Sequence, residues 1–239
     1  MAKITVAKNA GYCYGVRRAI EKAQGCAKAG EGPVYTAGPL IHNKFVVSQL
    51  EGQGIYSRDT IEAIPDGAQV VVRAHGITRQ QQEQLEQKGC RIVDATCPHV
   101  ARIHRIVEEE SAKGRHILII GSRAHPEVVG IASRCGQHTV LENLEEVAEF
   151  IKNLEEKPLS VVAQTTFNRE IFVNCTNLLK NTCKSIGIFD TICNATDERQ
   201  REARILAAES DAVIVIGDKT SSNSRRLYEI CCQVCRDTV

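Results

Sequence analysis

The feature that most constrains the fold of this 239-residue chain is a spacing that occurs three times. Residues 93–97 and 189–193, which lie 96 residues apart, both read as an apolar residue, Asp, two further residues and Cys. After each Cys a glycine follows 24 residues on, and a His or Ser stands four residues beyond that glycine. The N-terminal part has the same layout, with Cys13, a glycine 25 residues later and His42 four residues beyond it. Self-similarity of this kind predicts three related structural units.

Short β-branched runs alternate with amphipathic stretches along the chain, a pattern that is typical of βαβ units and a parallel sheet. The runs that predict strands are 34–37, 69–73, 91–93, 117–120, 159–163 and 212–216. The stretches that predict helices are 16–29, 98–112, 144–154, 168–183, 195–209 and 223–235. We therefore expect an α/β fold of three pseudo-repeated units with mostly parallel sheets, covering residues 1–96, 97–190 and 191–239. The third unit is expected to be incomplete, because its last strand end would fall beyond Val239.

Composition excludes several classes of protein. Hydrophobic residues make up 43% and charged residues 25% of the chain, which is typical of a globular domain and not of a disordered one. Thirty basic and 29 acidic residues leave no basic field for nucleic acid or an anionic membrane. The apolar runs are far shorter than the roughly 20 residues of a bilayer span, and residues 1–20 contain no secretory signal. We expect a cytoplasmic protein without a nucleic-acid or membrane partner.

Three of the eleven cysteines, Cys13, Cys97 and Cys193, occur once in each predicted unit, just before a predicted helix. A helix N-terminus favours negative charge, so we expect it to lower the pKa of these thiols. Three thiolates from distant segments suit either zinc or an iron–sulfur cluster, and the spacing alone does not choose between them. The alternative is that they are buried or unrelated thiols.

Seven of the other cysteines are interpreted as structural. Four of them lie on or beside apolar helical faces and are expected to pack as small hydrophobic side chains: Cys26, Cys135, Cys175 and Cys183. A second group lies late in a predicted helix and not at a strand-to-helix turn, which argues against thioredoxin-like chemistry: Cys231, Cys232 and Cys235.

A set of polar residues follows the predicted strands at corresponding places in the units. Its members are His42, His75, His125, Ser221, Ser222 and Asn223. Each alone is more often structural, but together they predict a ring of hydrogen-bond donors around an oxyanion such as a phosphate or diphosphate. Protonated histidines would add positive charge to that ring. No glycine-rich nucleotide motif is present, so side chains are expected to hold the anion.

Glu127 opens a helix two residues after His125. Its carboxylate is either a partner for the helix dipole or, if it lies near a metal centre, a proton relay. Thr165 follows a predicted strand and is placed to position the proton or a substrate oxygen.

Seven short motifs in this order resemble the 4-hydroxy-3-methylbut-2-enyl diphosphate reductase family, and they span nearly the whole chain. In sequence letters they are GYCYGVRRA at 11–19, IHN at 41–43, AHG at 74–76, DATCP at 94–98, HPE at 125–127, QTT at 164–166 and SSNS at 221–224. Any one of these motifs would be weak, but seven ordered matches are highly specific.

The resemblance implies a three-lobed α/β fold around a [4Fe-4S] cluster held by Cys13, Cys97 and Cys193. It implies reductive removal of the allylic hydroxyl of (E)-4-hydroxy-3-methylbut-2-enyl diphosphate, which yields isopentenyl and dimethylallyl diphosphates. It also implies a ferredoxin or flavodoxin as electron donor. The residues it assigns to the diphosphate are His42, His75, His125, Ser221, Ser222 and Asn223, with Thr165 beside the substrate hydroxyl and Glu127 as the proton source.

The chain departs from this family at its end. Family members continue with a further strand and a Gly-Ala-Ser segment whose serine also binds the diphosphate. We therefore expect weak activity at best from this form. The alternatives are a catalytically impaired fragment that binds only metal or diphosphate, and a zinc-stabilised α/β protein without a redox role.

Overall fold

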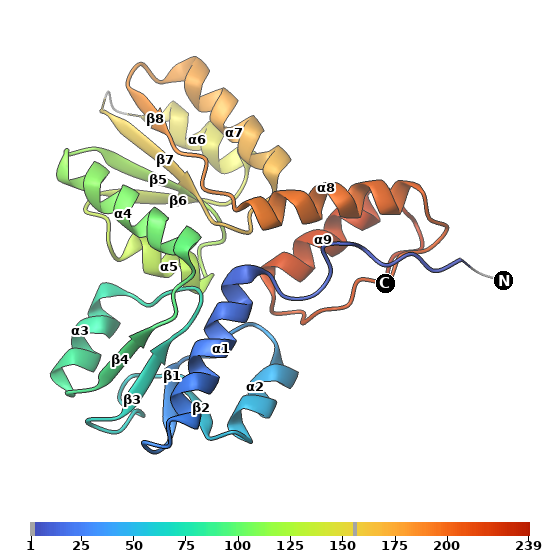
Figure 1. The fold of residues 1–239 in the computed structure, drawn as a ribbon. Helices are drawn as coiled ribbons and strands as arrows, with labels where there is room; N and C mark the ends of the chain where they lie inside the picture. The colour runs from blue at the N-terminus through green and yellow to red at the C-terminus, as the bar shows by residue number, and fades with distance from the viewer. Residues whose placement is uncertain (1–2, 155–156) are drawn as a thin grey trace.

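The computed structural model describes residues 3–154 and 157–239, and in these ranges the strands form two four-stranded parallel sheets (Figure 1). The strands of sheet one are β1 Val34–Ala37, β2 Ile55–Arg58, β3 Gln69–Val72 and β4 Arg91–Asp94, in the order β2-β1-β3-β4. The strands of sheet two are β5 His116–Ile120, β6 His138–Leu141, β7 Leu159–Ala163 and β8 Ile186–Ile188, in the order β6-β5-β7-β8. The order is the same in both sheets and every pairing is parallel, so the predicted α/β fold is confirmed.

The helices around sheet one are α1 Tyr14–Lys28, α2 Lys44–Glu51 and α3 Arg79–Gln87, and those around sheet two are α4 Pro98–Ala112, α5 Pro126–Ala132, α6 Leu144–Lys152 and α7 Arg169–Thr182. The helices α8 Asn194–Ala208 and α9 Ser222–Cys232 follow. Six helices begin at a side chain that accepts a hydrogen bond from the first turn: Asn43, Thr78, His125, Asn143, Asn168 and Ser221. Such caps typically contribute about 1 kcal/mol each. Within the described ranges, no helix has both the length and the apolar character that a membrane crossing requires.

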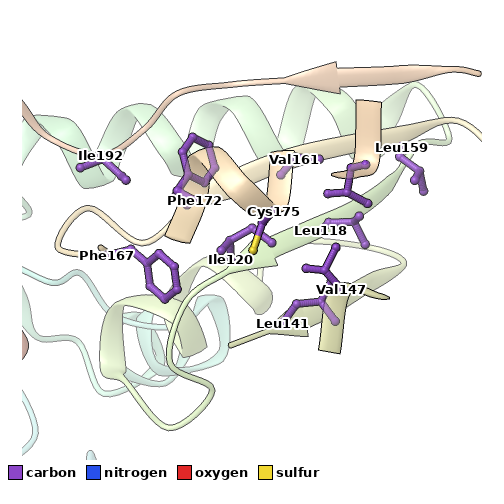
Figure 2. Packing of buried hydrophobic residues seen from close by; sticks show 12 residues of the cluster. Leu118, Ile120, Leu141, Val147, Leu159, Val161, Phe167, Phe172, Cys175 and Ile192 are labelled. Carbon is purple, nitrogen blue, oxygen red and sulfur yellow. The ribbon is translucent and has the colours of Figure 1, made fainter. Parts of the chain in front are cut away.

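Helices cover both faces of each sheet. Successive residues of a strand point to opposite faces, so Leu118 and Ile120 of β5 pack against α6 and α7 (Figure 2). Ile117 and Ile119 pack against α4 and α5 on the other face. Every residue of β5 and β7 is buried, as expected for parallel strands between two helical layers. Sheet one is built in the same way, with α1 and α2 on one face and α3 on the other.

The part of the chain after sheet two has helices but no sheet in the described residues. Helices α8 and α9 pack against each other and lie beside the N-terminal residues (Figure 1). The predicted strand 212–216 is wrong, because Val213 and Thr238 form a single isolated parallel bridge in its place. Ile214 and Ile216 are 74% and 93% exposed, since no described strand or helix covers them.

All but one of the cysteines outside the predicted site contribute to packing. Cys175 is fully buried in the core of sheet two (Figure 2), and Cys231 and Cys235 form a small cluster with Ala207. Cys232 is exposed at the end of α9. Four others are half-buried and pack against the cores: Cys26, Cys90, Cys135 and Cys183.

Candidate functional site

Three fifteen-residue helices, α1, α4 and α8, each begin directly after one of the predicted ligand cysteines, Cys13, Cys97 or Cys193. In the described residues none of these thiols caps its helix, although Cys193 Sγ lies 3.0 Å from the Thr196 hydroxyl in the first turn of α8. Two of the cysteines are tied to the carboxyl edge of a sheet. The Cys97 N–H donates to the Ala74 carbonyl at 2.9 Å, and the Cys193 N–H donates to the Thr165 carbonyl at 3.1 Å.

The three thiols lie within electrostatic range of one another. Burial raises the pKa of the Cys97 thiol, and Cys13 and Cys193 raise it further. Burial also raises the pKa of Cys193, with smaller contributions from Cys13 and Glu127. N–H groups in the first helical turn lower these two pKa values, as predicted for a helix N-terminus, but burial outweighs them, so the predicted net lowering is wrong for Cys97 and Cys193.

Gly15 in the first turn of α1 makes room for this meeting of helices. A Cβ at position 15 would lie 2.6 Å from the Cys97 sulfur, which is far inside van der Waals contact. The glycine thus allows the beginnings of α1 and α4 to approach each other. Thiols are ordinary ligands of zinc and of iron–sulfur clusters, so the donor set fits both groups.

The histidines predicted to bind an anion also lie together. His42, His75 and His125 follow strands β1, β3 and β5, and one ring nitrogen from each lies within 4.8 Å of the other two. The ring centroids are 4.5 Å apart for His42 and His75, 5.5 Å for His42 and His125, and 5.4 Å for His75 and His125. The sheet-two histidine thus meets the two sheet-one histidines, because the carboxyl edges of the sheets face each other.

The three histidines are neutral near pH 7. Burial lowers the pKa of each, to about 4 for His125 and well below the usual value for His75. Arg73 lowers all three further, so its guanidinium lies within electrostatic range of the whole group. His42 Nε2 and His75 Nδ1 are buried and form no hydrogen bond with any described residue. This group therefore holds ring nitrogens ready for a ligand, next to a permanent positive charge.

Glu127 is 1% exposed and connects the histidines to the thiols. Its carboxylate accepts hydrogen bonds from the Thr165 N–H at 2.6 Å and the Thr165 hydroxyl at 2.7 Å. Burial raises the pKa of Glu127 to about 7, although the two hydrogen bonds from Thr165 oppose the rise. Glu127 comes two residues after His125, and Thr165 is bonded through its carbonyl to Cys193.

The loop that leads into α9 joins the site from a third direction. Ser221 caps α9, and the Ser222 hydroxyl lies 3.0 Å from the hydroxyl of Thr166 and 3.2 Å from the side-chain amide of Gln164. Asp218 of the same loop accepts from the Lys44 N–H at 2.9 Å, next to the sheet-one residue Asn43. Ser221, Ser222 and Asn223 are half-buried here. A cavity of about 410 Å³ lies on this side, between His42 and Thr220.

Two residues of the candidate site, Arg73 and Gln164, were not predicted from the sequence patterns. Arg73 stands between β3 and His75, and its Nε donates to the Gly76 carbonyl at 3.2 Å. Gly38, with φ +77°, leaves room for the Arg73 guanidinium, since a Cβ there would lie 2.5 Å from Nη1. Gln164 is buried and accepts from the Ser122 N–H at 3.0 Å, which ties the ends of β5 and β7. An arginine at a predicted strand end beside a histidine was the signal available for Arg73.

Comparisons with known proteins agree with this arrangement. The family model described as LytB protein matches residues 4–239. The 4-hydroxy-3-methylbut-2-enyl diphosphate reductase of Clostridioides difficile (strain 630) is 39% identical over 228 residues, covering 95% of this chain and 82% of the relative. The reductase of the same name from Aquifex aeolicus (strain VF5) is 38% identical over 234 residues, covering 96% of this chain and 80% of the relative.

Solved structures agree as well. The E-1-hydroxy-2-methyl-but-2-enyl-4-diphosphate reductase of Plasmodium falciparum superposes with a TM-score of 0.89 at 31% identity, covering 96% of this chain and 73% of that one. A second structure, of (E)-4-hydroxy-3-methyl-but-2-enyl diphosphate reductase, the terminal enzyme of the non-mevalonate pathway, gives a TM-score of 0.75 at 37% identity, covering 100% and 85%. Matched along nearly all of its length in sequence and in fold, the chain belongs to the LytB family.

Proposed function

We propose that this chain is an oxidoreductase of isoprenoid biosynthesis that reduces (E)-4-hydroxy-3-methylbut-2-enyl diphosphate to isopentenyl and dimethylallyl diphosphates. The curated relatives carry the name of that reductase. The reaction breaks the allylic C–O bond, consumes two electrons and two protons, and releases water. The observation that carries the proposal is the link from His125 through Glu127 and Thr165 to Cys193, which joins an anion site, a proton holder and a thiol centre.

In this proposal Cys13, Cys97 and Cys193 hold a [4Fe-4S] cluster. Three uncapped thiols at three helix N-termini suit an anionic metal centre, and the Cys97 and Cys193 thiols deprotonate on binding metal despite their raised pKa. When bound, the cluster supplies electrons one at a time and a Lewis-acidic iron for the C–O bond. A zinc-stabilised protein is the alternative on donor type alone, but family membership favours the cluster.

We assign the diphosphate to His42, His75 and His125, with Ser221, Ser222 and Asn223 closing the site from the α9 side. The three ring nitrogens would also suit a single metal ion by their spacing. Arg73 decides against that reading, because a guanidinium in electrostatic range of all three histidines attracts an anion and repels a cation. The unpaired nitrogens of His42 and His75 then serve as donors to phosphate oxygens once they take up protons.

Glu127 is proposed to deliver the proton. With a pKa of about 7 it carries a proton on a large fraction of molecules at neutral pH, as a general acid must. The Thr165 hydroxyl now donates to Glu127 and is placed to orient the substrate hydroxyl between the carboxyl group and the thiol centre. We also propose that residues 1–96, 97–190 and 191–239 form the three units, and that a one-electron carrier such as ferredoxin or flavodoxin supplies the electrons.

The test is product formation by anaerobically purified, iron-loaded chain with a chemical one-electron reductant and the proposed substrate. We expect isopentenyl and dimethylallyl diphosphates, and we expect Glu127→Gln to bind iron normally while making at least about 100-fold less product. Iron-loaded chain that binds the substrate but forms neither product contradicts the proposed function. A Glu127→Gln rate equal to that of the unchanged chain contradicts only the proton role.

A further inference from the structure

The carboxylate of Glu202 on α8 receives three hydrogen bonds from the N-terminal segment. The Lys8 N–H donates to Oε1 at 2.6 Å, and the Asn9 N–H and side-chain amide both donate to Oε2 at 3.0 Å. Arg199, three residues earlier on the same helix, donates from Nη2 to the Gly11 carbonyl at 2.7 Å. Residues three apart lie on one face of a helix, so these two side chains hold residues 8–11 along a single line.

The N-terminal segment runs along α8 toward the beginning of that helix, where Cys13 follows. Residues 8 and 9 contact position 202, residue 11 contacts position 199, and α8 itself begins after Cys193. The segment therefore runs against the direction of α8, toward its N-terminus, and Figure 1 shows it beside this part of the molecule. Two residues after Gly11 stands Cys13, whose thiol is coupled electrostatically to that of Cys193.

Cys13 is held differently from the other two thiols. The N–H groups of Cys97 and Cys193 are bonded to sheet-edge carbonyls, whereas no such bond from the Cys13 N–H is present in the described chain. Residues 3–13 form no helix or strand, and Ile4, Val6 and Tyr12 are 87%, 75% and 45% exposed, so apolar packing does not anchor the segment. The hydrogen bonds to α8 therefore hold the segment before Cys13, as hydrogen bonds to sheet edges hold Cys97 and Cys193.

We propose that Glu202 and Arg199 are positioning residues that clamp residues 8–11 onto α8 and thereby place Cys13 beside Cys193. The proposal rests on the assignment of these two thiols to one metal centre. Both side chains bind the backbone of the N-terminal segment. The Glu202 carboxylate accepts from two consecutive N–H groups, and the Arg199 guanidinium donates to the Gly11 carbonyl. Loss of the clamp would free Cys13 without touching the cores of either sheet.

The test uses the full chain with Glu202→Ala, Glu202→Gln and Arg199→Ala. The matched control is Glu198→Ala, because Glu198 is an exposed glutamate of the same helix whose side chain forms no hydrogen bond or ion pair with the described residues. Three quantities are measured: amide exchange over residues 8–11, the yield of the Cys13–Cys193 disulfide when iron-free chain is briefly oxidised with diamide, and the rate at which loaded chain loses iron to a chelator. Thermal unfolding identifies any variant that fails to fold, and Glu202→Gln, which keeps an oxygen acceptor, is the milder substitution.

We expect Glu202→Ala to exchange faster over residues 8–11, to lower the disulfide yield about fivefold and to speed iron loss by a similar factor, as losing a cluster of hydrogen bonds would do. Glu202→Gln should fall between it and the unchanged chain, and Glu198→Ala should match the unchanged chain. Faster exchange with unaltered disulfide yield and iron loss would overturn the positioning role, as would unaltered exchange. A chain that binds no iron would refute the proposed metal centre, while the disulfide yield would still decide the clamp.

Discussion

At the scale of single residues, Glu127 shows how burial sets chemistry. The two hydrogen bonds from Thr165 favour the ionised carboxylate, yet the site is so fully desolvated that the pKa of Glu127 still rises to about 7. Because the folded state prefers the protonated form, this group contributes most to stability below its usual pKa of 4.5. That contribution is lost as the pH rises through 7.

We therefore predict that Glu127→Gln abolishes one pH dependence of stability. Between pH 5 and pH 8 the unfolding free energy of the unchanged chain should fall relative to that of the variant, by up to about 3 kcal/mol. Urea unfolding of both proteins at the two pH values measures this difference. Parallel pH profiles would show that Glu127 titrates normally in the folded protein.

Arg73 is predicted to supply the positive charge that the anion site needs. Since the histidines are neutral above pH 7, Arg73 supplies the permanent charge, and we predict that Arg73→Met weakens binding of inorganic diphosphate at pH 8 by about tenfold or more. Removing Arg73 also removes one cause of the low histidine pKa values, so the loss should shrink at pH 6. Calorimetric titration measures both, with Arg105→Met as control, because Arg105 is exposed on α4. Unchanged affinity at pH 8 would remove Arg73 from the site.

The residue scale also shows what a sequence reveals. The thiols and histidines were candidates because they occur at repeated places, all except Cys13 after a strand, and Glu127 was a candidate because it opens a helix beside His125. Arg73 and Gln164 were not predicted, because their roles depend on residues that are distant in sequence. The Arg73 guanidinium lies against Gly38, and the Gln164 side chain contacts Ser222. The net pKa shifts of Cys97 and Cys193 were predicted with the wrong sign, since the depth of burial follows from packing between distant segments.

At the scale of elements, the predictions succeeded where the local signals were strong. Helix 98–112 was predicted with its observed bounds because Pro98 fits the first helical position and the apolar period is regular. The patterns did not predict α3, which buries only Leu85 among its nine residues, although Thr78 and Gln81 form a capping box. Several other short elements were also not predicted: α2, β2, β6 and β8. The strand 212–216 was wrong because an apolar run forms a strand only where a neighbouring strand pairs with it.

Gly15 is predicted to be necessary for the close approach of α1 and α4. Gly15→Ala would push the Cys97 sulfur away from the beginning of α1, so we predict that the iron bound per chain falls to less than about half. Gly25→Ala in the same helix is the control: a Cβ there meets nothing within 4 Å, and replacing a helical glycine should stabilise by about 0.5–1 kcal/mol. Iron analysis and thermal unfolding of both variants decide the matter. Equal iron content in the two would show that α1 and α4 need no close approach.

At the scale of the whole molecule, the site exists only where three parts meet. The parts are joined at this place by polar contacts: Asp218 to the Lys44 N–H, Ser222 to Thr166, and Glu202 to the N-terminal segment. The threefold spacing in the sequence predicted that corresponding strand ends converge. How closely they approach was not predictable, because it depends on those few polar contacts and on the glycines that let the helices touch.

The iron and acid-labile sulfide content of anaerobically purified chain tests directly whether Cys13, Cys97 and Cys193 hold a [4Fe-4S] cluster. It is compared with Cys13→Ser, Cys97→Ser and Cys193→Ser, and with Cys232→Ser as the exposed-thiol control. We predict about four iron and four sulfide per chain for the unchanged protein and for Cys232→Ser, as a [4Fe-4S] cluster requires, and a large loss in each of the other three. An unchanged chain without iron after anaerobic reconstitution, or full iron in any of those three variants, would contradict a cluster held by these thiols.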